Sequence, residues 1–253
     1  MSLIDQDAFE GLDAALPVWQ RQVFADVRAR LEPPSLFPCT FSQNAFRRRL
    51  LQFSFVERLD ERGLAQSTED LRDFIEESRK WDGQVNTARP LIVAFSRHLA
   101  DFGSLKEYHE FGWHVLQRWN DIDPAEWPGD VATDPNQPFW SMCFAGMQLF
   151  VNMSAPRHTR RKSRNLGEHF LFIVNPRERF DLVAGDTEEG RKLRRQIRKR
   201  VEAYDGYPHS LQLGSFQAGE IEWWQYGIIE ENVERTDRCP FHVGIRASTV
   251  EAP

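Results

Sequence analysis

Apolar residues recur at helical spacing near the start of the chain, and this pattern predicts an amphipathic helix over residues 9–31. Pro33 and Pro34 follow this segment and are typical of a helix end. The apolar positions that would share its inner face are Leu12, Leu16, Trp19, Val23, Val27 and Leu31.

Alternating or continuous apolar runs predict the strands of a sheet. Apolar and polar residues alternate over 51–56, and LIVAF at 91–95 is a short β-rich run typical of a fully buried strand. Residues 140–153 predict two strands that turn near Ala145-Gly146. Further strands are expected at 170–174 and, rich in aromatic residues, at 221–229.

Three later segments have helical periodicity. Ser67, with Asp70 three residues on, is expected to cap a helix through about Lys80, and residues 104–120 place Tyr108 and Trp119 inward. Residues 187–203 form a basic helix. Because several of the strands read as meander pairs, we expect an α+β fold, a mainly antiparallel central sheet flanked by helices, in a single domain spanning 1–253.

Composition narrows the class of protein. The chain has 253 residues and a net charge of −6, which disfavours a general nucleic-acid binder. No apolar run reaches the roughly 18 residues of a membrane span, and the N-terminus does not resemble a secretion signal, so a soluble, cytoplasmic protein is expected. The cysteines Cys39, Cys143 and Cys239 lack the CxxC spacing of a zinc site or of heme attachment.

Common catalytic motifs are missing from the sequence. HExxH, GxSxG, a phosphate-binding P-loop and GxGxxG are all absent. The basic run RKLRRQIRKR at 191–200 is more typical of a solvated helix face than of a nucleic-acid site.

Residues 140–167 join an apolar strand pair to a cationic loop that carries His158, and this junction predicts a site for an anionic ligand. Heme suits such a site, because its iron takes a histidine or thiolate, its propionates pair with Arg or Lys, and its macrocycle packs on aromatic walls. The alternative is that His158 is an ordinary surface or hydrogen-bonded residue. The aromatic candidates are Trp113, Trp140, Phe144 and Phe150.

Two cysteines are alternative ligands. Cys39 and Cys239 lie in short FPC and CPF sequences, and a thiolate ligand favours oxygen activation at heme iron. Each is also consistent with a small buried hydrophobic residue.

Motifs spread along nearly the whole chain resemble those of the YqcI/YcgG family, which includes heme-dependent N-hydroxylases of arginine and related guanidines. They are FPC at 37–39, FSFVE at 53–57, WP at 127–128, WSMCFAGMQLFV at 140–151, PRHTRRKSRNLG at 156–167, EWWQYG at 222–227 and CPF at 239–241. Their order and spacing together make the resemblance fairly specific.

The resemblance implies a non-covalent b-type heme, oxygen activated at its iron, and electrons from an external donor. His158 is the first candidate for the axial ligand, followed by His114, His209 and Cys239. The propionates and the backbone of the loop would share Arg157, Arg160, Arg161 and Arg164.

A guanidine, amine or amino-acid substrate needs a carboxylate in the pocket, and Glu57 and Glu222 adjoin apolar segments within these motifs. Both could instead pair with the arginine loop. The sequence thus predicts a cytoplasmic heme-dependent monooxygenase that N-hydroxylates a small nitrogen compound in a specialised biosynthetic pathway. The competing hypothesis is a non-catalytic heme or anionic-ligand carrier or sensor. The sequence leaves open whether the protein forms a homodimer.

Overall fold

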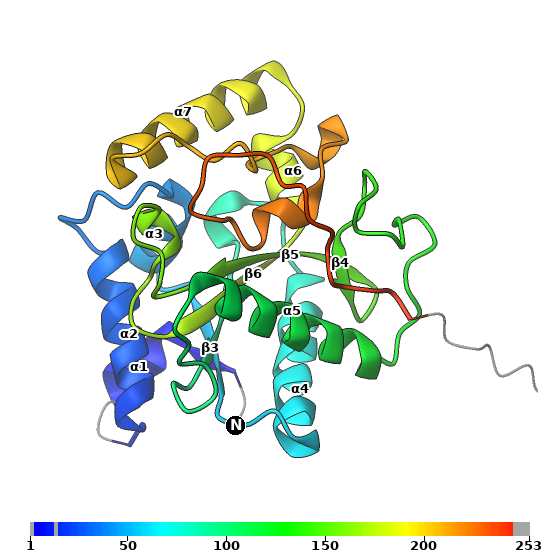
Figure 1. Ribbon diagram of the computed structural model, residues 1–253. Coiled ribbons are helices and arrows are strands. Elements are labelled where there is room, and N and C mark those ends of the chain that lie inside the picture. Colours follow the sequence, from blue (N-terminus) through cyan, green and yellow to red (C-terminus); the bar gives the residue numbers. More distant parts are fainter. Residues whose placement is uncertain (1–2, 13–14, 245–253) are drawn as a thin grey trace, which may run out of the picture.

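A computed structural model of the chain describes residues 3–12 and 15–244, and Figure 1 shows its arrangement. The described strands form a six-stranded sheet in the order β1-β2-β3-β6-β5-β4. Neighbouring strands are antiparallel except for β2 and β3, which are parallel and are connected through α4. The expected α+β class with a mainly antiparallel sheet is confirmed. The strands are β1 Ile4–Asp5, β2 Gln52–Val56, β3 Leu91–Phe95, β4 Met142–Phe144, β5 Met147–Ser154 and β6 Phe170–Pro176.

Helices cover both faces of the sheet, and short 3-10 turns lie in the connections. The helices are α1 Gln6–Leu12, α2 Val18–Leu31, α3 Thr40–Arg47, α4 Glu61–Ser78, α5 Leu105–Ile122, α6 Glu178–Ala184 and α7 Glu188–Asp205. The 3-10 turns are η1 Val85–Thr87, η2 Lys162–Arg164, η3 Phe216–Ala218 and η4 Glu222–Gln225.

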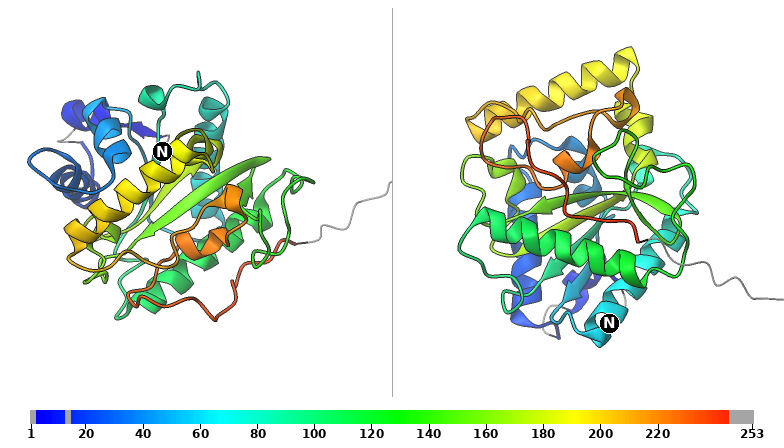
Figure 2. Two further views of the ribbon diagram at one scale, coloured as in Figure 1. Left: turned by 90° about the horizontal axis from the view of Figure 1, so that it is seen from above. Right: turned by 45° about the vertical axis from the view of Figure 1, so that its right-hand side comes forward.

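The first face of the sheet packs on α4 and α5. Alternate residues of β3, β5 and β6 point to this side, among them Val93, Val151 and Phe172, all buried. They meet Phe74 of α4 and Trp119 of α5. Figure 2 shows α4 and α5 on the side of the sheet that faces away from α7.

The second face is covered in two parts. Phe53, Ile92 and Leu171 pack under α1, α2 and α3. Beyond them, α7 crosses over β5 and β6, as the left view of Figure 2 shows. Here β5 points Phe150, Asn152 and Ser154 away from the core that its alternate residues fill.

Several of the expected elements are confirmed. The predicted strands at 91–95 and 170–174 correspond to β3 and β6, and the basic helix corresponds to α7. The strand pair of 140–153 turns at Ala145 and Gly146, with φ values of 47° and 73° that match the turn of a two-residue hairpin. The helix expected from Ser104 has that residue as its N-cap, in a capping box with Glu107.

Two predicted helix boundaries were wrong. The helix expected over 9–31 is interrupted, and α2 begins after Pro17. The Leu12 side chain and residues 13–14, which that prediction included, lie outside the described part of the chain. The helix expected from Ser67 starts at Glu61, because Asp60 caps it by accepting the N–H of Gly63. The Ser67 hydroxyl instead bonds the Leu64 carbonyl inside the helix.

The strand predicted at 221–229 was also wrong, because residues 222–225 form η4. Trp223 and Tyr226 both point into the core beside α5, and their spacing of three places them on one side of a helical turn. A strand would have pointed them to opposite sides. The segment is fixed to β5 by the N–H of Met153, which donates to the Tyr226 carbonyl at 2.8 Å.

Candidate functional site

A cavity of about 280 Å3 lies between α7 and the second face of the sheet, and we call it the main cavity because of its extensive lining. Its floor includes Phe150, Asn152, Ile173 and Asn175 of β5 and β6. Its roof is one side of α7, where Ile197 and Val201 are four residues apart and flanked by Arg194 and Arg198. The start of α3, residues of α6, and η4 close its sides. The cavity therefore combines apolar walls with a few charged groups, as ligand sites do.

Cys39 contributes its thiol to this cavity from the N-cap position of α3. Its Sγ accepts hydrogen bonds from the backbone N–H of Ser42 at 3.4 Å and from the Ser42 hydroxyl at 3.1 Å. Cys39 is a free cysteine. These two hydrogen bonds fix the position of the sulfur at the start of α3. The thiol is thus placed to ligate a metal centre inside the cavity.

Arg164 is a partly buried cation of the cavity wall. It ends η2, and burial lowers its pKa to about 10. Its Nη1 is enclosed and finds no hydrogen-bond partner among the described residues. Such an unmatched buried donor is costly unless a ligand supplies an acceptor. Together with Arg194 and Arg198 of α7, Arg164 makes this wall suited to an anion.

Acidic groups lie at another part of the cavity, around Arg177. Glu222 Oε1 is 3.1 Å from Arg177 Nε, and Asp181 Oδ1 is 2.8 Å from Arg177 Nη2. Glu222 is 1% exposed. Burial raises its pKa to about 7, against the opposing effect of Arg177 and with a further rise from Asp181. Two carboxyls that share one guanidinium can accept a second cation.

The predicted metal ligand His158 is placed elsewhere. Its Nδ1 is 2.7 Å from Glu230 Oε1, and its ring centroid is 5.9 Å from that of His109. Burial lowers the pKa of His158, and it lowers that of His109 to about 3. The Nε2 of His158 is buried and has no hydrogen-bond partner among the described residues. His158 is not one of the described residues that line the main cavity.

The four arginines of the cationic loop have different surroundings. Arg161 is buried and donates to the carbonyls of Ile229 and Pro208, which fixes the loop to the segment opposite. Arg157 is exposed and donates to the Phe102 carbonyl, and Arg160 is exposed over the Tyr207 ring. Among these four, Arg164 is the one that the structure places in the cavity wall.

The predicted aromatic wall is divided between two places. Phe150 lines the cavity. Trp113, Trp140 and Phe144 belong to the core on the other face of the sheet. The cavity takes further aromatic residues from segments that the sequence did not single out as pocket walls, namely Phe37, Phe41, Phe180 and Phe216.

The remaining candidates lie away from the cavity. His114 is exposed on α5, and His209 pairs with Glu202 at 2.6 Å. Cys239 is buried in the core, which raises the pKa of its thiol to about 12. Of the predicted substrate carboxylates, Glu222 lines the cavity, whereas Glu57 is exposed and accepts a hydrogen bond from Trp19 Nε1 at 2.8 Å.

Sequence reasoning missed four charged residues of the cavity, Arg177, Asp181, Arg194 and Arg198. The two on α7 had a signal: Arg194 and Arg198 flank Ile197 within the inward side of an amphipathic basic helix. Arg177 and Asp181 had no such signal in the sequence, because α6 is short and carries no distinctive motif.

The described part of the chain contains no group of three or more His, Cys, Asp and Glu side chains able to hold a metal ion. A metal at Cys39 would therefore need other ligands, which a porphyrin supplies. None of the described helices is long and apolar enough to cross a membrane.

Comparison with known proteins gives a consistent result over almost the whole chain. The model of the YqcI/YcgG family matches residues 27–242. DcsA of Streptomyces lavendulae, whose name proposes it as an N(omega)-hydroxy-L-arginine synthase, is 52% identical over 223 residues, covering 88% of this chain and 84% of that protein.

Two uncharacterized Bacillus subtilis proteins also match. YcgG is 32% identical and YqcI 30% identical, each over 92% of this chain and 91% of its own length. No solved structure matches.

Proposed function

The chain belongs to the YqcI/YcgG family, and from this premise we propose that it is a heme-dependent monooxygenase that N-hydroxylates the guanidine group of L-arginine or a close analogue. The name of DcsA supports the reaction and the substrate class. The observation that carries the proposal is the composition of the main cavity, where the Cys39 thiol, a wall with three arginines and the buried Glu222 line one space.

The residues of the cavity fit a heme. Leu166, Ile173, Ile197 and Val201 provide apolar contact for a macrocycle. Arg164, whose Nη1 has no partner among the described residues, would pair with a propionate, and Arg194 and Arg198 are the further cations at that wall.

Cys39 replaces His158 as the residue that would ligate the heme iron. Cys39 lines the cavity, and two hydrogen bonds from Ser42 hold its sulfur in position. His158, by contrast, is enclosed between Glu230 and His109. When bound, a thiolate-ligated heme supplies activated oxygen for insertion into an N–H bond, with two electrons from an external donor that reduce the second oxygen atom to water.

Glu222 and Asp181 would bind the guanidinium of the substrate. Both already surround Arg177, so the site accepts planar, forked donors. Because the pKa of Glu222 is about 7, its carboxylate can hold or release a proton near neutral pH. A guanidinium held there would be oriented by two carboxyls and shielded from water on one side by the sheet that forms the floor of the cavity.

The absorption spectrum of the protein purified with added hemin tests the cofactor. We expect a Soret band and, after reduction and addition of carbon monoxide, a band typical of thiolate ligation. Cys39→Ser should abolish or shift these bands. His158→Ala is the matched control and should retain them. No Soret band in the wild-type protein, or loss of the band in His158→Ala alone, would contradict the proposal.

Product analysis tests the reaction. Wild-type protein supplied with L-arginine, oxygen and a reductant is expected to form hydroxylated arginine, which mass spectrometry detects. Glu222→Gln should weaken the spectral change caused by arginine while leaving the Soret band in place. A heme-loaded protein that binds arginine and yields no hydroxylated product would support the alternative of a binding or sensor protein.

A further inference from the structure

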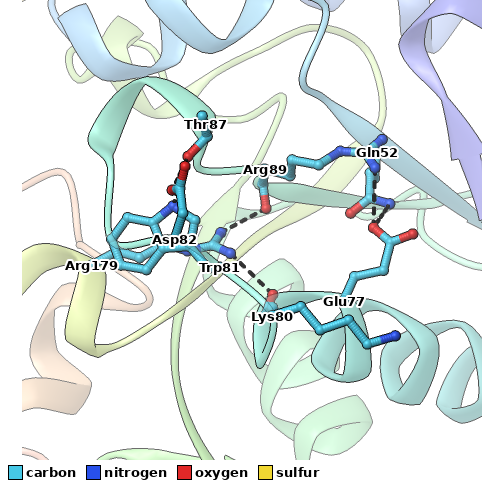
Figure 3. A pocket seen from close by; sticks show the side chains of 9 residues that line it. Gln52, Glu77, Lys80, Trp81, Asp82, Thr87, Arg89 and Arg179 are labelled. Carbon is cyan, nitrogen blue, oxygen red and sulfur yellow. Dashed lines mark hydrogen bonds and ion pairs between the residues drawn. The ribbon is translucent and has the colours of Figure 1, made fainter.

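A second cavity of about 340 Å3 includes Arg179 of α6 and lies between β2, the end of α4 and η1 (Figure 3). Its lining includes the charged or amide side chains of Gln52, Glu77, Arg89 and Arg179, together with the Trp81 ring. None of these residues lines the main cavity. The proposed reaction at the α7 cavity therefore does not explain them.

Two deeply buried side chains of this lining have unmatched polar atoms. Gln52 is 1% exposed, and its Oε1 finds no hydrogen-bond partner among the described residues. Arg179 is 7% exposed, and its Nε is likewise unmatched within the described part of the chain. One is an acceptor and the other a donor, and leaving both unsatisfied costs free energy. A ligand that completes the site must offer one donor and one acceptor.

The charge of the lining differs between its two ends. Arg89 pairs with both Glu77, at 3.1 Å, and Asp5, so two carboxylates share one guanidinium near Gln52. Gln52 Nε2 also donates to Glu77 at 2.8 Å. Glu77 and Asp5 exceed Arg89 by one negative charge at this end, and the side chain of the exposed Lys80 extends on the same side (Figure 3).

The other end is positive. Arg179 donates to the Arg89 carbonyl at 2.7 Å and to the Ser78 hydroxyl at 3.1 Å, and it lies over the Trp81 ring at 5.2 Å. It forms no ion pair with any described carboxylate. Figure 3 shows Gln52 and Glu77 on one side of the cavity and Arg179 with Trp81 on the other. Lys80 and Asp82 are exposed, and Asp82 accepts hydrogen bonds from Thr87 and the Gln84 N–H.

We propose that this second cavity binds a small zwitterion, a free α-amino acid, with the carboxylate at Arg179 Nε and the ammonium at Gln52 Oε1 and Glu77. The ammonium meets the excess negative charge, and the carboxylate pairs with the buried guanidinium that lacks an anionic partner among the described residues. Both unmatched atoms then gain partners. A carboxylate alone, or an amine alone, would satisfy only one of them.

Four compounds with a three-carbon frame test the proposal by calorimetric titration of the wild-type protein. L-Alanine carries both charged groups, L-lactate a carboxylate and a hydroxyl, propionate the carboxylate alone, and isopropylamine the ammonium alone. We expect saturable binding of alanine, with lactate about tenfold weaker and the other two weaker still. Propionate binding as tight as alanine, or no binding of any compound at millimolar concentration, would overturn it.

Variants locate the binding. Gln52→Met and Arg179→Lys should each weaken alanine binding by about tenfold. Glu222→Gln, in the main cavity, is the control and should leave it unchanged. Loss of binding in Glu222→Gln with retention in Gln52→Met would place alanine in the main cavity and overturn the proposal. Gln52→Met or Arg179→Lys alone decides the location where the other variant does not fold, which circular dichroism would show.

Discussion

Neighbouring residues of the cationic loop have opposite roles, and Arg160 and Arg161 show this most clearly. Arg161 donates from Nε and Nη1 to two carbonyls on different segments, at 2.7 and 3.2 Å, whereas Arg160 is exposed. The forked guanidinium of Arg161 cannot be replaced by an ammonium, which has a single nitrogen. Arg161 therefore stabilises the fold, because its guanidinium donates hydrogen bonds to backbone carbonyls.

Arg161→Lys should lower the free energy of unfolding by about 2 kcal/mol, because buried carbonyls lose charge-assisted donors. Urea denaturation monitored by circular dichroism measures it. Arg160→Lys is the matched control and should change the free energy by less than about 0.5 kcal/mol. Equal effects of the two substitutions would contradict the different roles.

Glu222 makes stability depend on pH. Its pKa in the folded protein is about 7, above the ordinary value of 4.5, so the folded state binds more protons than the unfolded state between these values. Stability is therefore retained at low pH and falls as pH rises through about 7. Relative to Glu222→Gln, the wild-type free energy of unfolding should fall by on the order of 2 kcal/mol between pH 5 and pH 8.

Urea denaturation of both proteins across this pH range measures the effect. Glu220→Gln, two residues away at an exposed position, is the control and should show no such difference between the two pH values. A constant difference between wild type and Glu222→Gln would show that Glu222 does not bind its proton more tightly in the folded state.

At the scale of single residues, the sequence identified Glu222 and Cys39 as candidates. It could not show which of the candidate residues line the cavity. The two sequences FPC and CPF look alike, yet Cys39 lines the cavity and Cys239 is buried in the opposite core. Arg164 and Arg161 are equally basic in the sequence. Which face of the sheet each residue meets depends on contacts between segments far apart in the chain.

The start of α4 shows how local geometry sets an element's boundary. Asp60 caps the helix through the N–H of Gly63, and a Cβ added to Gly63 would lie 2.0 Å from the Arg58 carbonyl oxygen. The backbone carbonyl cannot move away as a flexible side chain could. Glycine is required there by the close approach of the preceding turn.

Gly63→Ala should therefore destabilise the protein by about 1–3 kcal/mol through overpacking. Gly129→Ala is the control, since a Cβ there meets nothing within 4 Å, and it should be neutral or slightly stabilising. Thermal unfolding of the two variants compares them. A Gly63→Ala protein as stable as Gly129→Ala would show that the turn before α4 relaxes freely.

Element types with a strong period were predictable, and those fixed by tertiary contact were not. LIVAF at 91–95 and the capping box at Ser104 carry local signals that the structure confirms. The aromatic run around Trp223 has none that separates a strand from a helical turn, and packing beside α5 decides it.

On the scale of the whole molecule, the sheet separates two different interiors. One face carries an aromatic core with α4 and α5, and the other carries a cavity closed by segments from α3, η2, α6, α7 and η4. The sequence identifies each of these segments, but it does not show which of them contact one another in the folded protein. This is why the fold class was predictable, while most of the cavity's lining was not.

Hemin binding should protect one side of this sheet. Hydrogen exchange followed by mass spectrometry is expected to slow in residues 37–42 and in α6 and α7 after hemin is added, because ligand binding disfavours their local opening. Peptides from α5 serve as an internal control and should change little. Equal protection of both sides would place the heme elsewhere.

The short helix α6 belongs to both cavities. Asp181 and Phe180 line the main one, while Arg179, between them and Arg177, lines the second. An occupant of either space thus acts on the position of the same seven residues. If a ligand at Arg179 changes the affinity for a ligand at Asp181 by some factor, then the ligand at Asp181 must change the affinity for the ligand at Arg179 by the same factor.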